Sequence, residues 1–78
     1  MAPEQARAAR AMLKVGVRDV AEATGVTPNT VSRIEASTDP SKRGPQASTV
    51  AVIKTWYENQ GLEFIPENGG GPGVRLKK

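Results

Sequence analysis

Residues 25–35 of this chain read Gly-Val-Thr-Pro-Asn-Thr-Val-Ser-Arg-Ile-Glu, and this stretch decides the fold. Thr27 is a favourable helix N-cap, and Pro28 falls at the first helical position, where its missing N–H costs nothing. Helical spacing turns Val31 and Ile34 to one side and leaves the polar and cationic residues on the other. A short helix with such an outer face, directly after a glycine turn, is suited to enter a nucleic-acid groove.

The composition narrows the possible functions. The chain has 78 residues, which is enough for one small domain, and its net charge of +3 suits an anionic partner. It contains no Cys and no His, so disulfides and thiolate metal sites are excluded and the commonest general base is missing. Its acidic residues are scattered, so we expect no enzyme, no metal site and no cofactor, and nothing in the sequence indicates a small-molecule ligand. Because no signal-peptide pattern and no membrane-spanning run occurs, we expect a cytoplasmic protein without a membrane partner.

Apolar periodicity predicts a mainly helical domain. The predicted helices cover residues 4–13, 17–24, 28–36 and 46–60. We expect the first helix to turn one stripe inward, formed by Gln5, Ala8, Ala9, Met12 and Leu13. The second helix should bury Val20 and Ala21 and end at Gly25, which suits the residue after a helix. Residues 37–45, with two prolines and one glycine, predict an ordered loop.

The fourth helix and the segment after it complete the pattern. The expected apolar face of this helix consists of Val50, Ile53, Trp56 and Tyr57, and Gly61 should close it. Residues 62–65 and 74–77 favour strands, joined by a glycine- and proline-rich connection over 66–73. Such a hairpin is marginal alone, so it should pack on the helices, pair with another chain, or stay mobile. We therefore divide the chain into a helical domain, 1–61, and an extended tail, 62–78.

Within this pattern the chain resembles a known family, on the residues Arg10, Leu13, Val20-Ala21, Gly25-Val26-Thr27, Val31 and Ile34-Glu35. They match the lambda-repressor-like (XRE/Cro-type) helix–turn–helix regulators of phages and bacteria, over about Glu4 to Tyr57. The resemblance implies a compact four- to five-helix domain that binds double-stranded DNA operators as a homodimer and usually represses transcription. The tail lies outside the family motif and looks like the strand extensions that some small members use for dimer contacts.

The helix over residues 27–36 carries the candidate base contacts. Asn29 can pair bidentately with adenine, and Arg33 with guanine. The resemblance also places Thr27 and Pro28 at base-contacting positions, with Thr30 and Ser32 as lesser candidates. The alternatives are a solvated side chain for Asn29, and a phosphate contact or a free surface charge for Arg33.

Three basic residues are candidate phosphate contacts. Arg18 lies in the first turn of the second helix, where a cation opposes the helix dipole, a local cost that gripping a DNA phosphate would explain. Many family members carry Gln just before this point, whereas this chain has Val17. The alternative for Arg18 is an ion pair with Glu22, one helical turn later. Lys42 and Arg43 match basic loop positions that contact sugar-phosphate in the family; alone, such a pair is usually only solvated.

The remaining candidates are structural. The resemblance implies an ion pair between Arg10 and Glu35 that ties the first helix to the end of the third. Candidate dimer contacts are Trp56, Phe64, Ile65, Val74 and Leu76. Trp56 and Tyr57 suggest base stacking less than they suggest packing, because they share helical spacing with Val50 and Ile53.

Two functions are therefore compared. The first is a dimeric, sequence-specific DNA-binding regulator of transcription, located in the cytoplasm and on the nucleoid, that acts as a repressor through residues 27–36. The alternative is an antitoxin-like or phage-type adaptor whose tail captures another protein by adding a strand to its exposed edge. Either function requires a surface that the rest of the chain leaves open.

Overall fold

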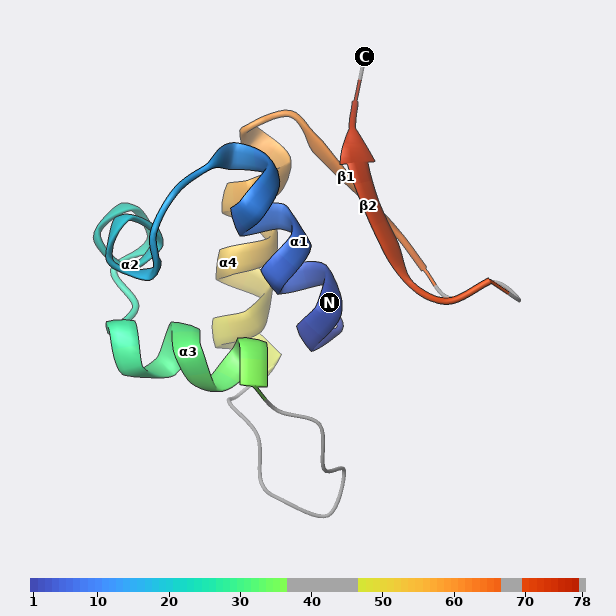
Figure 1. Cartoon of the computed structure of the whole chain (residues 1–78). Coiled ribbons are helices and arrows are strands. Elements are labelled where there is room, and N and C mark those ends of the chain that lie inside the picture. Colours follow the sequence, from blue (N-terminus) through green and yellow to red (C-terminus); the bar gives the residue numbers. More distant parts are fainter. Residues whose placement is uncertain (37–46, 67–69, 78) are drawn as a thin grey trace.

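The computed structural model describes residues 1–36, 47–66 and 70–77, which form four helices followed by an antiparallel hairpin (Figure 1). The helices are α1 (Pro3–Leu13), α2 (Val17–Thr24), α3 (Pro28–Ala36) and α4 (Ala47–Asn59), and the strands are β1 (Leu62–Ile65) and β2 (Gly73–Leu76). The predicted mainly helical class with a short hairpin is confirmed. The loop predicted over 37–45 lies outside the described residues. The bounds of each helix and strand agree with the predicted bounds to within one residue.

The turns that separate the first three helices depend on local chemistry. Lys14 ends α1 in the left-handed region, with φ of 57°. Asp19 stabilises the first turn of α2, because its carboxylate accepts a hydrogen bond of 2.7 Å from the N–H of Gly16, the residue before the helix. Gly25 ends α2 with φ of 78°, a conformation that glycine adopts without strain, and its N–H donates to the carbonyl of Ala21. The steep turn from α2 into α3 therefore follows directly from Gly25.

A single core joins the helices and the hairpin. Its buried apolar side chains are Ala6, Ala9, Val20, Ala21, Val31, Ile34, Ile53, Tyr57 and Leu62. The pairs predicted to turn inward on α2 and α3 are all among them, as are Ile53 and Tyr57 of α4. Because Leu62 of β1 belongs to the same core, the hairpin packs on the helical part of the chain.

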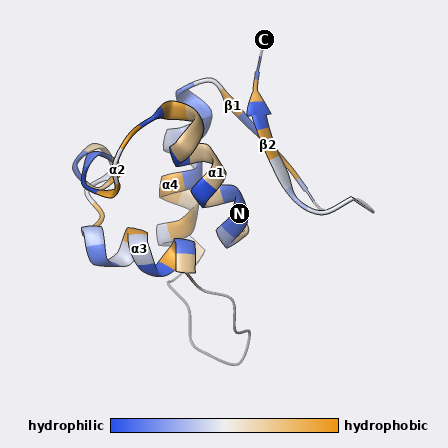
Figure 2. Ribbon diagram, viewed as in Figure 1, coloured by the Kyte–Doolittle hydropathy of each residue, from blue (hydrophilic) through white to orange (hydrophobic). Residues whose placement is uncertain are grey.

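The hairpin presents one apolar face to α1 and α4. In its register Leu62 lies opposite Leu76, and Phe64 lies opposite Val74, so all four side chains share one face of the sheet. Hydrophobic and hydrophilic residues alternate along β2 (Figure 2). Of the three possibilities left open for the tail, packing on the helices is the one observed.

The stripe predicted for α1 is only partly correct. Gln5 and Ala9 are buried and Leu13 is half-buried, but Ala8 and Met12 are exposed, Met12 to 38%. Ala6 is buried in their place. The buried side of α1 is shifted toward Ala6 because the helix contacts α3 through Arg10 and the hairpin through Gln5, which lie on different sides of it. An apolar strip along α1 is therefore left uncovered by the described residues.

Candidate nucleic-acid interface

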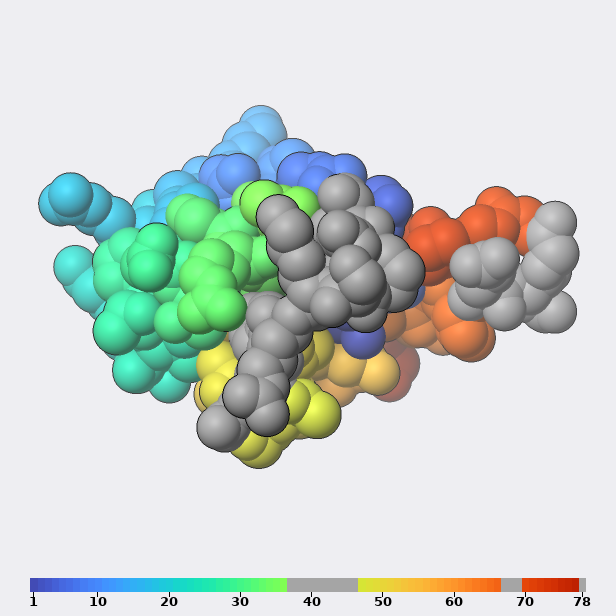
Figure 3. All heavy atoms as spheres, turned by 90° about the horizontal axis from the view of Figure 1, so that it is seen from below, coloured from blue at the N-terminus to red at the C-terminus, as the bar shows by residue number. Residues whose placement is uncertain are grey.

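Helix α3 exposes the polar face that the sequence assigns to it. Pro28, Asn29, Ser32 and Arg33 are exposed, whereas Val31 and Ile34 are buried. Seen from below, the side chains of α3 lie openly on the surface beside those of α2 (Figure 3). The described residues therefore leave the side chains of Asn29 and Arg33 accessible.

Two threonines hold the start of α3. The hydroxyl of Thr27 accepts a hydrogen bond of 3.3 Å from the N–H of Thr30, which is the N-cap bond expected from the sequence. The two hydroxyls also bond to each other at 2.9 Å. Thr27 is exposed and Thr30 is half-buried. Both hydroxyls already serve the helix, so any contact of theirs to a base would have to share these bonds.

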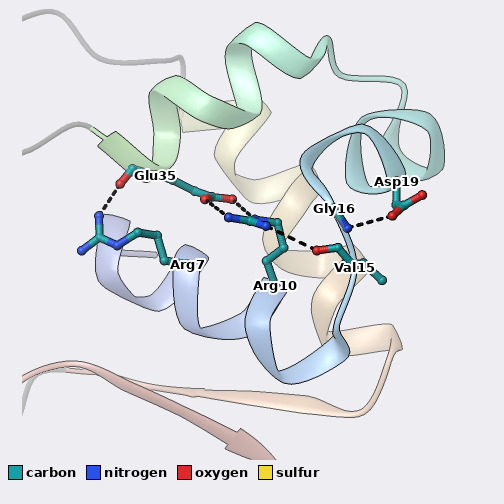
Figure 4. A network of polar contacts seen from close by, with 6 residues as sticks. All are labelled: Arg7, Arg10, Val15, Gly16, Asp19 and Glu35. Atoms are coloured by element: carbon teal, nitrogen blue, oxygen red, sulfur yellow. Dashed lines mark hydrogen bonds and ion pairs between the residues drawn. The ribbon is translucent and has the colours of Figure 1, made fainter.

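Helix α1 holds the other end of α3 through two arginines (Figure 4). Arg10 Nε lies 2.9 Å from one carboxylate oxygen of Glu35, and Arg10 Nη2 lies 3.0 Å from the other. Arg7 donates to the backbone carbonyl of Glu35, at the end of the helix where the dipole favours a cation. The Glu35 side chain is 9% exposed and that of Arg10 is 31% exposed. The structure thus brings Arg10 and Glu35 together as a partly buried, bidentate pair.

The electrostatics around this pair shift two pKa values. The hydrogen bond to Glu35 raises the pKa of Arg10, so the guanidinium stays charged. Burial, with a smaller contribution from the Glu35 charge, raises the pKa of Tyr57 to about 12. The Tyr57 hydroxyl is also buried without a hydrogen-bond partner among the described residues. Tyr57 is therefore a neutral, unsatisfied group beside an ion pair.

The turn between α2 and α3 forms a hollow of about 460 Å³, lined by Arg18, Ala21, Glu22, Gly25, Val26, Thr27 and Pro28. Arg18 and Glu22 are both exposed, and within residues 1–36, 47–66 and 70–77 no ion pair joins them. Arg18 is thus available to a phosphate. Because the Glu22 carboxylate lines the same hollow, a phosphate held by Arg18 should lie outside it.

The other candidate residues lie elsewhere. Lys42 and Arg43 fall outside the described residues. Trp56 is half-buried with its ring 5.3 Å from that of Tyr57, so it contributes mainly to packing. The candidate dimer contacts of the hairpin divide by exposure: Phe64, Ile65 and Val74 are half-buried, and Leu76 is 55% exposed.

The sequence reasoning missed two residues of α1. The sequence patterns give no role to Arg7, although an arginine one turn before Arg10 can reach the same helix end. They place Gln5 in the buried stripe and predict no further role for it. Its Nε2 donates to the carbonyls of Ile65 and Gly73, at 2.9 and 2.8 Å, while its Oε1 accepts from the N–H of Ala2 at 2.7 Å. A polar residue in an otherwise apolar stripe was the signal that could have revealed it.

Comparisons with known proteins add no family assignment. No protein-family model matches the chain, and a search of curated proteins finds no match. None of the helices in the described ranges has the length and apolar character needed to cross a membrane. Among the same residues, no three acidic side chains gather closely enough to hold a metal ion. The candidate interface therefore rests on its own geometry.

Proposed function

We propose that this chain is a sequence-specific, double-stranded DNA-binding regulator of transcription that acts as a repressor. Helix α3 would lie in the major groove, with Asn29 and Arg33 reading base edges and Arg18 gripping a phosphate. One observation carries the proposal: α3 buries Val31 and Ile34 while its opposite, polar face is exposed. The Arg10–Glu35 pair supports it, because a reading helix must keep a fixed angle to its neighbours.

The proposed regulator binds as a dimer to a pseudo-palindromic operator. Two copies of α3 would then lie about one DNA turn apart, ~34 Å, and face two half-sites. The proposed dimer contact is either α4, through Trp56, or the hairpin. Sedimentation of the full chain with and without its selected DNA tests this: two chains per site support the proposal, and one chain per site contradicts it.

Selection of bound sequences from a random pool of duplexes tests the DNA-binding proposal. A selected site should bind the unaltered chain far more tightly than random duplex does. Replacing Arg33 by Ala should weaken binding to that site by ~1–3 kcal/mol and relax the preference at one base pair. Asn29→Ala should do the same at a different base pair.

Lys77→Ala is the matched control, because it removes the same charge from an exposed position on the hairpin. It should leave the base preferences unchanged. An equal loss on selected and random DNA for Arg33→Ala would show that Arg33 contacts only phosphate. A pool from which no sequence is enriched would end the proposal.

A further inference from the structure

The outer edge of β2 has hydrogen-bonding groups without a strand partner. The N–H of Lys77 donates to the carbonyl of Gly61 at 2.7 Å, so these two residues form a hydrogen-bonded pair of the antiparallel ladder. Such pairs alternate with pairs whose backbone groups point away from the partner strand. The register therefore turns the N–H and C=O groups of Val74 and Leu76 outward. Among the described residues the sheet has only two strands, so no third strand meets this edge.

The C-terminal half of the β2 edge, residues 75–77, is accessible. Arg75, Leu76 and Lys77 are exposed, whereas Leu62, Phe64 and Ile65 of β1 are buried or half-buried. The β2 edge is therefore the more open of the two. An exposed strand edge of this kind is a site for the addition of another strand.

A strip on α1 would support an added strand from beneath. Ala8 and Met12 follow Gln5 by three and seven residues, which places them on the same side of the helix. Gln5 already touches the hairpin through Ile65 and Gly73, yet Ala8 and Met12 are exposed. The last turn of α1 and the last residues of β2 lie toward the same end of the molecule (Figure 1). Met12, near the end of α1, and the 55% exposed Leu76, at the end of β2, are both exposed apolar side chains.

A second copy of this chain does not fit the edge. If two β2 edges pair around a two-fold axis with Val74 opposite Leu76, Arg75 lies directly opposite its own copy, and like charges at that position are destabilising. A shift that centres on Leu76 places Arg75 opposite Lys77. The opposite shift, centred on Val74, brings Pro72 opposite Leu76, and proline has no N–H to donate. Each register therefore carries a penalty, which favours α4 over the hairpin edge as the proposed dimer contact.

An acidic strand fits where a second copy does not. Arg75 and Lys77 point to the outer face of the sheet, where Arg75 already bonds to Glu63 at 3.0 Å. Lys77 lies opposite Gly61, which has no side chain to offer it. A carboxylate across from each cation would place Arg75 between two acids and give Lys77 an ion-pair partner, which the described residues do not supply. The residue between those two carboxylates would turn to the inner face, toward Leu76.

We propose that the outer edge of β2 binds an extended acidic segment of another protein, with acidic and apolar residues in alternation, as a third strand. The site lies at the end of the molecule away from α3 (Figure 1), so it does not depend on the proposed DNA binding. Nucleic acid could also meet Arg75 and Lys77. It would leave the edge N–H groups and the apolar surface of Leu76 unused, so a peptide is favoured.

The test uses the full chain labelled with ¹⁵N and the peptide acetyl-Gly-Val-Glu-Val-Glu-Val-Gly-amide. Binding should shift the amide signals of Val74 and Leu76 far more than those of α2 and α3. The same peptide with Lys in place of Glu should not bind. A peptide N-methylated on its pairing edge should bind at least several-fold more weakly, because one ladder hydrogen bond is lost. Lys77→Gln should weaken binding of the Glu peptide by about two- to fivefold.

Thr55→Glu is the matched control for Lys77→Gln, because it changes the net charge equally from an exposed position on α4. It should bind the Glu peptide as the unaltered chain does. Four results would overturn the proposal: no shift at Val74 and Leu76 with millimolar peptide, equal binding of the Lys peptide, concentration-dependent shifts of these amides without peptide, or the same shifts with a short duplex DNA. The third result would identify a second copy as the occupant, and the fourth a nucleic acid.

Discussion

Helix α1 holds α3 on one side and the hairpin on the other, and it uses different chemistry for each. Toward α3 it presents two cations, which grip the carboxylate and the carbonyl of Glu35. Toward the hairpin it presents one neutral amide, Gln5, whose two donors reach carbonyls that the register also places within the β-ladder. Removing Glu35 would leave the charge of Arg10 without a counter-ion. Removing the Gln5 side chain would leave the carbonyls of Ile65 and Gly73 with their hydrogen bonds in the β-ladder. We therefore expect α3 to be more sensitive than the hairpin to the loss of a single contact with α1.

The largest effect should come from breaking the α3 side. Glu35→Ala leaves the partly buried Arg10 without its counter-ion and should lower the free energy of unfolding by about 2 kcal/mol, less than for a fully buried pair because Arg10 is partly solvated. Urea denaturation of the variant measures this. Glu63→Ala is the control: its pair with Arg75 has side chains 43% and 64% exposed, so the loss should be below about 0.5 kcal/mol.

A second variant separates charge from packing on that side. Replacing Arg10 by Met together with Glu35 by Leu removes both charges at similar volume, and it should recover much of the loss of Glu35→Ala. Equal destabilisation by Glu35→Ala and Glu63→Ala would show that the Arg10–Glu35 pair does not hold α3 against α1.

The sequence predicts the turn between α2 and α3 better than it predicts the contacts of α1. The α2–α3 turn depends on Gly25, Thr27 and Pro28, whose preferences are local, so it could be placed from the sequence alone. The side of α1 that is buried could not be predicted, because Ala6, Ala8 and Ala9 carry the same side chain and only the positions of α3 and the hairpin decide which of them are buried.

The candidate site shows a similar limit. The exposure of Asn29 and Arg33 was predictable from the spacing of Val31 and Ile34. The two bonds from Gln5 to the hairpin span more than half of the chain, and no local pattern indicates them. Which residues of β2 turn their N–H and C=O groups outward depends on which pairs of the hairpin are hydrogen-bonded, and the sequence does not reveal this.

A smaller effect should come from breaking the hairpin side. Gln5→Ala removes three hydrogen bonds of a buried side chain and should cost about 1–2 kcal/mol, because the strand carbonyls keep their partners in the ladder. Hydrogen exchange should show faster exchange in β1 and β2, with α2 and α3 little changed. Glu4→Ala, at the exposed neighbouring position, is the control. Equal loss of protection in α3 would mean that the two sides of α1 are not independent.

The smallest effect at neutral pH should come from replacing Tyr57, which lies in the core near both the hairpin and the Arg10–Glu35 pair. Its ring lies 6.2 Å from that of Phe64 on β1, and its buried hydroxyl has no partner among the described residues. Tyr57→Phe removes that hydroxyl and should leave the free energy of unfolding unchanged or raise it by less than about 1 kcal/mol. A clear loss of stability would show that the hydroxyl has a partner, such as a buried water.

The pH dependence of stability sharpens this prediction. Burial, and to a lesser extent the charge of Glu35, raises the pKa of Tyr57 to about 12, whereas an unfolded tyrosine has a pKa of about 10. The folded state therefore binds the proton more tightly, so this contribution is complete below pH ~10 and is lost as the pH rises toward ~12, by about 1.4 kcal/mol per pH unit. The difference in unfolding free energy between Tyr57→Phe and the unaltered chain isolates the contribution of Tyr57, because the ionisation of the lysines at high pH affects both chains alike. The chain contains one tyrosine, so its ultraviolet absorbance titrates this group directly. Ionisation near the unfolded value in a chain that is still folded would show that Tyr57 is solvated and does not join the hairpin to the Arg10–Glu35 pair.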